Sequence, residues 1–101
     1  MKNMKVIEIM DKMHSIIEQV PDGVTVGYLW LNTSTPFGEM PEITLYESHK
    51  TRPNGFYELA DKLGVMVTRT ERDEENDNLT MVSDGICLLM IVDKVSDDDD
   101  A

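Results

Sequence analysis

The chain has 101 residues, of which 20 are acidic and nine are basic, and its formal net charge is −11. A charge this negative disfavours direct binding to nucleic acid or to an anionic membrane, because phosphates repel it. The 41% of hydrophobic residues excludes a chain that is disordered throughout and is enough for one small core.

The acidic charge is concentrated in the last third of the chain. Residues 71–101 carry eleven acids against two bases, a net of −9, whereas residues 1–70 carry nine acids against seven bases, a net of −2. The excess falls in two runs, residues 71–77 and residues 97–100. We expect such runs to remain solvated and to attract basic surfaces over roughly one Debye length, about 8 Å at physiological salt.

The first half of the chain predicts a helix followed by a hairpin. Apolar residues recur at helical spacing over residues 4–20, and Pro21 ends the helix. Strands are expected at Val24–Asn32 and Glu42–Glu47, joined by a long exposed loop rich in turn-forming residues. Strict alternation along the first strand places four side chains on one face: Val24, Val26, Tyr28 and Trp30.

The second half predicts a short helix and three strands. The helix begins at Asn54 or Gly55 and is closed by Gly64 in a left-handed conformation. Strands are expected over residues 65–70, 79–82 and 86–92, with an acidic loop at 71–78 and a type I′ turn at Asp84-Gly85.

These elements follow the order αββαβββ, which predicts an α+β fold. We expect an antiparallel sheet of four or five strands with both helices packed on one face, because that arrangement buries both apolar helix stripes. Residues 1–95 should form a single domain, followed by a flexible acidic tail at 96–101. The single cysteine, Cys87, allows no internal disulfide, which favours a cytoplasmic location. It lies in an apolar run, where we expect it to be buried and inert.

Residues 55–92 resemble small uncharacterised acidic proteins encoded by bacteriophages and prophages. The shared pattern is a short helix that ends in Leu63-Gly64, a strand with Val65 and Val67, a charged loop, and a hairpin that turns at Asp84-Gly85. The resemblance implies an accessory phage protein. That class includes small acidic inhibitors of host nucleic-acid-binding machinery, and also proteins with no known role.

Acidic and aromatic residues are the main candidates for binding a partner. Aromatic side chains dominate the energy of protein interfaces, and carboxylates raise the rate of association with a basic surface. Carboxylates on a rigid sheet can also imitate the phosphates of a nucleic acid. The predicted partner-binding residues are Glu71, Asp73, Glu74, Glu75, Asp77, Trp30 and Phe37.

Two further kinds of site have weaker signals. His49, Lys50 and Arg52 form a basic cluster before the second helix and could bind an anion at its N-terminus. Asp73, Glu75, Asp77 and Asp84 match part of a calcium-loop template, but Asn78 stands where that loop needs glycine, so we expect no metal. No sequence motif of a catalytic nucleophile, a phosphate-binding loop or a metalloprotease is present, and no cofactor is expected.

The sequence therefore favours a non-enzymatic interaction module that binds a basic protein, for example a nucleic-acid-binding protein that it engages as a mimic of nucleic acid. One alternative is a small structural or assembly protein that forms homodimers or larger homo-oligomers through apolar contacts, at an open sheet edge or a methionine-rich helix face. Another is an anion-binding protein or small enzyme centred on residues 49–52.

Overall fold

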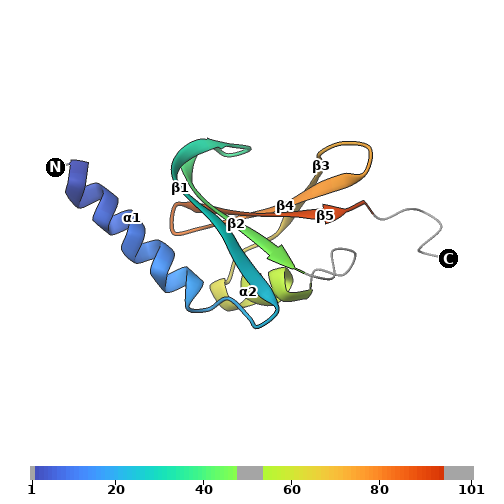
Figure 1. The fold of residues 1–101 in the computed structure, drawn as a ribbon, viewed down its shortest axis with the longest axis horizontal. Coiled ribbons are helices and arrows are strands. Elements are labelled where there is room, and N and C mark those ends of the chain that lie inside the picture. Colours follow the sequence, from blue (N-terminus) through green and yellow to red (C-terminus); the bar gives the residue numbers. More distant parts are fainter. Residues whose placement is uncertain (1, 48–53, 95–101) are drawn as a thin grey trace.

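The computed structural model describes residues 2–47 and 54–94 and contains two helices and one five-stranded sheet (Figure 1). The α+β class and the order αββαβββ are confirmed. The predicted tail at 96–101 lies outside the described residues. The elements are α1 (Lys2–Ile17), β1 (Val24–Thr35), β2 (Gly38–Glu47), α2 (Asn54–Leu63), β3 (Thr68–Glu71), β4 (Asn76–Ser83) and β5 (Ile86–Asp93).

The sheet is mixed rather than wholly antiparallel. Its strand order is β1-β2-β5-β4-β3, and β2 runs parallel to β5 while every other neighbouring pair is antiparallel. After β2, the helix α2 forms the connection to the meander β3–β4–β5. The last strand of that meander returns in the direction of β2, so the two halves of the sheet meet in a parallel pair.

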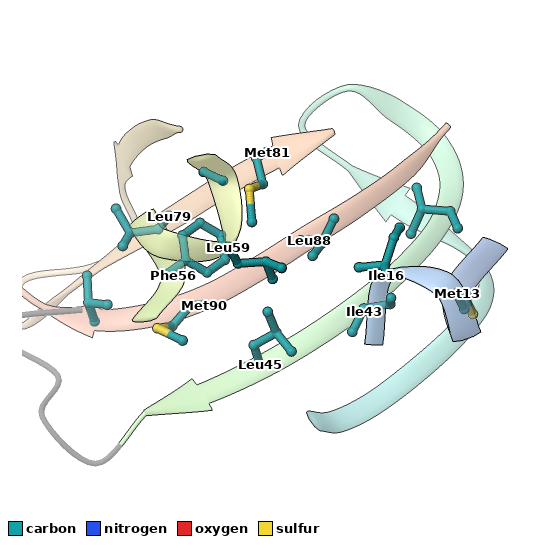
Figure 2. Packing of buried hydrophobic residues seen from close by; sticks show 13 residues of the cluster. Met13, Ile16, Ile43, Leu45, Phe56, Leu59, Leu79, Met81, Leu88 and Met90 are labelled. Atoms are coloured by element: carbon teal, nitrogen blue, oxygen red, sulfur yellow. The ribbon is translucent and has the colours of Figure 1, made fainter. Parts of the chain in front are cut away.

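Both helices pack on one face of the sheet, where they bury a single apolar core (Figure 2). Side chains alternate along β5, so Leu88 and Met90 point to the helices and meet the β2 residues in the same register, Ile43 and Leu45. Each helix contributes a short apolar stripe to this core: Met13 and Ile16 from α1, and Phe56, Leu59 and Ala60 from α2.

A β-bulge at Gly27 corrects the predicted faces of β1. Val26 is opposite Leu45, and Tyr28 is opposite Thr44, so Gly27 is an extra residue in β1. Because one extra residue reverses the alternation, Val24 and Val26 face the helices whereas Tyr28 and Trp30 lie on the other face.

The predicted loop at residues 32–41 is wrong as well. The strands extend to Thr35 and start again at Gly38, which leaves a turn of two residues, Pro36 and Phe37. Thr35 holds this turn: its Oγ1 accepts a hydrogen bond from the N–H of Phe37 (3.1 Å) and donates one to the carbonyl of Gly38 (2.8 Å). The polar side chains that suggested a loop therefore belong to the far end of a long hairpin.

Two predicted chain reversals are confirmed. Asp84 and Gly85 have φ angles of 53° and 77°, as a type I′ turn requires, and they join β4 to β5. At the end of α2, the N–H of Val65 donates to the carbonyl of Ala60 and the N–H of Gly64 donates to that of Asp61, a Schellman closure. No helix within residues 2–47 and 54–94 is long and apolar enough to cross a membrane.

The packing of the core predicts the effect of shortening individual side chains of α2. Phe56 is fully buried beneath the sheet, whereas its neighbour Tyr57 is 43% exposed. We expect Phe56→Ala to lower the free energy of unfolding by about 3–5 kcal/mol, because it removes a buried ring and leaves a cavity. Tyr57→Ala should cost less than about 1 kcal/mol. Denaturant unfolding measures both, and equal losses would contradict this description of the core.

Candidate functional site

Neither described helix packs on the other face of the sheet, which we call the open face; the far end of the β1–β2 hairpin bends over part of it (Figure 1). Its centre is apolar or hydroxylated, because alternation brings Thr44, Leu89 and Thr80 side by side across β2, β5 and β4. Thr44 and Thr80 are buried by their neighbours, while Leu89 is partly exposed. The open face is therefore a surface with few charges on a strongly acidic chain.

Three aromatic side chains stand at the β1–β2 side of the open face, and we call them the aromatic strip: Tyr28, Trp30 and Tyr46. The ring of Tyr28 is 6.1 Å from that of Trp30 and 6.4 Å from that of Tyr46, between centroids. The three side chains are between 38% and 56% exposed. Because these rings already pack against one another, they can contact a partner with little further loss of side-chain entropy.

Gly27 makes the position of Tyr46 possible. A Cβ atom at residue 27 would lie only 2.0 Å from Cε2 of Tyr46, so the ring occupies the space that a side chain would need. The bulge that turns Tyr28 toward the open face thus also makes room for the ring beside it. Sequence reasoning missed Tyr28 and Tyr46 as a pair. Gly27, within a strand otherwise rich in β-branched and aromatic residues, was the feature of the sequence that could have indicated a bulge or a close approach.

Glu42 and Cys87 lie side by side on the open face, next to the aromatic strip. They are register partners in β2 and β5, and both are buried. Burial raises the pKa of the Glu42 carboxyl, and the hydrogen bond that Thr44 Oγ1 donates to it (3.4 Å) offsets only part of the rise. Burial and the nearby Glu42 raise the pKa of the Cys87 thiol to about 12. A nucleophilic cysteine needs a lowered pKa, so this pair is unsuited to covalent catalysis.

The acidic segment, residues 71–77, is a tight hairpin rather than the loop expected at 71–78. Glu71 ends β3 and Asn76 begins β4, so only residues 72–75 form the turn. Asp73 Oδ1 accepts hydrogen bonds from the backbone N–H groups of Glu75 (2.8 Å) and Asn76 (2.7 Å), and these bonds lower the pKa of its carboxyl. Asp73 therefore shapes the turn.

Two other acids of this segment are paired with bases. Glu71 and Asp77 are register partners on neighbouring strands, an arrangement that places two like charges opposite each other. Arg69 Nε donates to Asp77 Oδ2 at 2.7 Å, and Lys94 pairs with Glu71. These bases offset the repulsion, which leaves Glu74 and Glu75 as the acids of the segment that are exposed and that make no such side-chain contact with a described residue.

The structure does not bring the predicted aromatic and acidic residues together. Trp30 lies in β1 and the acidic segment joins β3 to β4, so they occupy opposite edges of the sheet. Phe37, 49% exposed, lies in the β1–β2 turn, beyond the end of β2 that pairs with the start of β5, whereas the acidic turn lies at the end of β5. The strand order therefore separates Trp30 from the acidic segment.

The remaining candidate sites receive no structural support. His49, Lys50 and Arg52 lie outside the described residues. Asp84 stands in the β4–β5 turn, at the far end of β4 from Asp77, so the four acids of the calcium-loop template do not converge. Within the described ranges, no three histidine, cysteine or acidic side chains are grouped as a metal ion would need.

The ion pair between Arg69 and Asp77 should stabilise the β3–β4 hairpin. Arg69 also donates from Nη2 to the carbonyl of Asp93 (3.1 Å), so it ties three strands together. We expect Arg69→Met to lower the free energy of unfolding by about 2 kcal/mol, because it leaves the largely buried Asp77 unpaired. Arg72→Met is the control: the Arg72 side chain is exposed and, among the described residues, donates a hydrogen bond to Asn78 alone, so its loss should cost less than about 1 kcal/mol. Indistinguishable unfolding curves would refute the structural role of Arg69.

The raised pKa of Cys87 predicts an unreactive thiol. With a pKa of about 12, the thiolate fraction at pH 7 is on the order of 10⁻⁵, and the side chain is buried as well. We expect iodoacetamide to label the native protein only as fast as the protein opens, and to label it rapidly in denaturant. Mass spectrometry of the alkylated chain gives both rates. Native labelling at the rate of a free thiol would contradict the burial of Cys87.

Comparison with known proteins adds no relative to this description. Neither the protein-family models, nor the curated proteins, nor the solved structures that were searched include a match to this chain. The resemblance of residues 55–92 to small phage-encoded proteins therefore stays a prediction, and function has to be argued from the aromatic strip, the open face and the distribution of charge.

Proposed function

We propose that this chain is a non-enzymatic interaction module that binds a basic segment of a partner protein, such as the nucleic-acid-contacting surface of a nucleic-acid-binding protein. The observation that carries the proposal is the aromatic strip, three clustered and half-exposed rings on an open sheet face of a chain with net charge −11. Exposed aromatic clusters of this kind are typical of the energetic centres of interfaces.

The aromatic strip suits a partner that presents arginine or lysine. The faces of Trp and Tyr rings attract cations, and guanidinium groups also stack on them. The net charge supports the same partner from a distance, because a strongly acidic protein raises the rate at which a basic one arrives. Affinity would thus come from Tyr28, Trp30 and Tyr46, and the rate of encounter from the acids as a whole.

The acidic segment fits this long-range role better than direct imitation of nucleic acid. A mimic needs several free carboxylates in a row, whereas Asp73 holds the turn and Glu71 and Asp77 are paired with bases. Glu74 and Glu75 remain exposed in the turn. We therefore propose that these acids steer the partner and that the aromatic strip contacts it.

Affinity capture from a bacterial lysate at low salt tests the proposal, with elution by a salt gradient and titration of any purified partner. We expect a basic protein that is released at moderate salt and lost with Tyr28→Ala/Trp30→Ala. Removal of interface aromatics of this kind typically costs at least about 2 kcal/mol, or roughly 30-fold in affinity. Unchanged affinity of this double variant would contradict the proposal that the aromatic strip contacts the partner.

Two charge-reversed variants separate steering from direct contact. Glu74→Lys/Glu75→Lys changes the turn, and Asp22→Lys/Asp61→Lys changes two exposed acids elsewhere, so both variants have the same net charge. Steering predicts similar, salt-dependent losses in both, mainly in the association rate. A much larger loss for the turn variant would instead identify the acidic segment as the contact surface.

A further inference from the structure

The outer edge of β1 is a long strand edge, interrupted by the bulge at Gly27 and by a second register shift between Trp30 and Thr33. β1 is the first strand in the sheet order, so one of its edges has no partner strand among the described residues. Its twelve residues, Val24–Thr35, include no charged side chain and no proline. Monomeric proteins normally protect such an edge with lysine, proline or a covering loop, because unpaired N–H and C=O groups there will pair with another strand.

Apolar side chains flank this edge on the helix side. Leu29 and Leu31 of β1 are 52% and 45% exposed, and Ile7 and Met10 of α1 are 57% and 55% exposed. Together with the aromatic strip and Phe37, they make up eight of the ten large hydrophobic side chains that are exposed in the described residues; the other two are Tyr57 and Met66. The exposed apolar surface is thus gathered at one edge of the molecule.

Two shallow apolar grooves lie between α1 and this hairpin. One, of about 420 Å³, lies between the first half of α1 and the far part of the hairpin and includes Val6, Ile9, Leu31 and Met40. The other, of about 220 Å³, lies between Met10, Met13 and Leu29. Figure 1 shows the cause: α1 lies beside β1, with its first turns directed away from the sheet, so only part of the helix is packed on the core.

The distribution of charge decides what can cover this edge. The acidic segment lies at the opposite edge, on β3 and β4, and charges on α1 are mixed, with Lys5 and Lys12 near Glu8 and Asp11. A basic peptide would find no acidic side chain along the free edge of β1. A second copy of the chain presents the same uncharged strand and the same apolar side chains. Joined at β1, two copies would keep their acidic segments at the two far ends.

We propose that the chain forms a two-fold symmetric homodimer in which the β1 strands of two copies pair antiparallel along their free edges. A two-fold axis perpendicular to the sheet makes the pair antiparallel and keeps the helices of both copies on one face. The two five-stranded sheets become one. Ile7, Met10 and Leu29 of each copy approach their counterparts near the axis, and the aromatic strips stay on the opposite, uncovered face.

The size of this surface is adequate for a dimer. Half-exposed side chains of this size present on the order of 100 Å² each. Four such side chains on each copy, together with the main chain of paired strands, approach the roughly 1,200 Å² at which specific interfaces begin. Isologous pairing also closes the assembly, since each copy has a single β1 edge to offer.

Sedimentation equilibrium of the full chain tests the dimer, from low to high micromolar concentration and at several salt concentrations. We expect twice the chain mass of 11.5 kDa at high concentration. Association should strengthen as salt rises, because salt screens the repulsion between two chains of net charge −11. A mass that stays monomeric throughout would overturn the proposal, and so would species that grow beyond the dimer.

Charged substitutions locate the interface. Leu29→Lys and, independently, Ile7→Lys should each weaken dimerisation by roughly 30-fold or more, as the loss of a central apolar contact does. Met66→Lys is the matched control, since Met66 is 87% exposed between α2 and β3 and should leave the dimer intact. Thermal unfolding at low concentration verifies that each variant is folded. Folded variants that dimerise as the wild type does would contradict the β1 interface.

The outcome for the dimer is independent of the outcome for the basic partner. Dimerisation should increase with salt and depend on Leu29 and Ile7, whereas binding of a basic partner should decrease with salt and depend on Tyr28 and Trp30. Hydrogen exchange supplies the direct readout: outward amides of β1 should be protected at high concentration and exposed in Leu29→Lys. Equal exchange of these amides at low and high concentration would refute edge pairing.

Discussion

The parallel pairing of β2 with β5 is the contact on which the rest of the structure depends. On one side of it stands the β1–β2 hairpin, and on the other the β3–β4–β5 meander, and only this pair of strands joins them in the sheet. The register covers residues 42–45 and 87–90. Its helix-facing side chains, Ile43, Leu45, Leu88 and Met90, form the centre of the core (Figure 2), and α2 packs across them. Burial at this point thus holds the two halves of the sheet together.

The α2 helix is itself positioned by the same strand. The N–H of Gly55, in its first turn, donates to Oε1 of Glu47 at 2.9 Å, so the last residue of β2 satisfies a backbone group that the helix cannot. A Cβ atom at residue 55 would lie 2.4 Å from a Val24 methyl group, which shows how closely the helix start approaches β1 as well. The β1–β2 hairpin therefore fixes where the helix begins, and the helix in turn covers the joint between the halves.

The acidic residues and the exposed apolar side chains lie at opposite edges of the sheet. The β3–β4 edge carries the acids, and Arg69 and Lys94 compensate two of them at the positions where strand pairing would otherwise set like charges face to face. The β1 edge and α1 carry the exposed apolar side chains. The two ends of the molecule thus differ in character. The proposed dimer and the proposed basic partner do not compete for one surface, because the dimer uses the free edge and the helix side of β1, whereas the aromatic strip lies on the opposite face.

Hydrophobic periodicity was sufficient to predict both helices, the number and order of the strands and the class of the fold, because the apolar stripes of this chain are regular. It could not predict the parallel pair, since strand order depends on contacts between distant residues. The bulge at Gly27 was missed for a related reason: alternation is a local rule, and one inserted residue reverses it as far as the next register shift, which lies between Trp30 and Thr33. The roles of Asp73 and Asp77 could not be predicted either. The sequence does not distinguish a carboxylate that shapes a turn or pairs with Arg69 from one that has no partner.

The position of the joint also sets how the chain has to fold. Each hairpin closes between residues that are near in sequence, but Glu42 and Cys87 meet across 45 positions. Closing so long a loop costs conformational entropy before any contact between the two halves is made. Strand pairing within either half does not offset this cost. We therefore expect the hairpins to appear early and the union of the two halves to govern the folding rate. We expect the apolar residues of β2 and β5 to form the folding nucleus and α1, with two buried side chains among residues 5–17, to dock last.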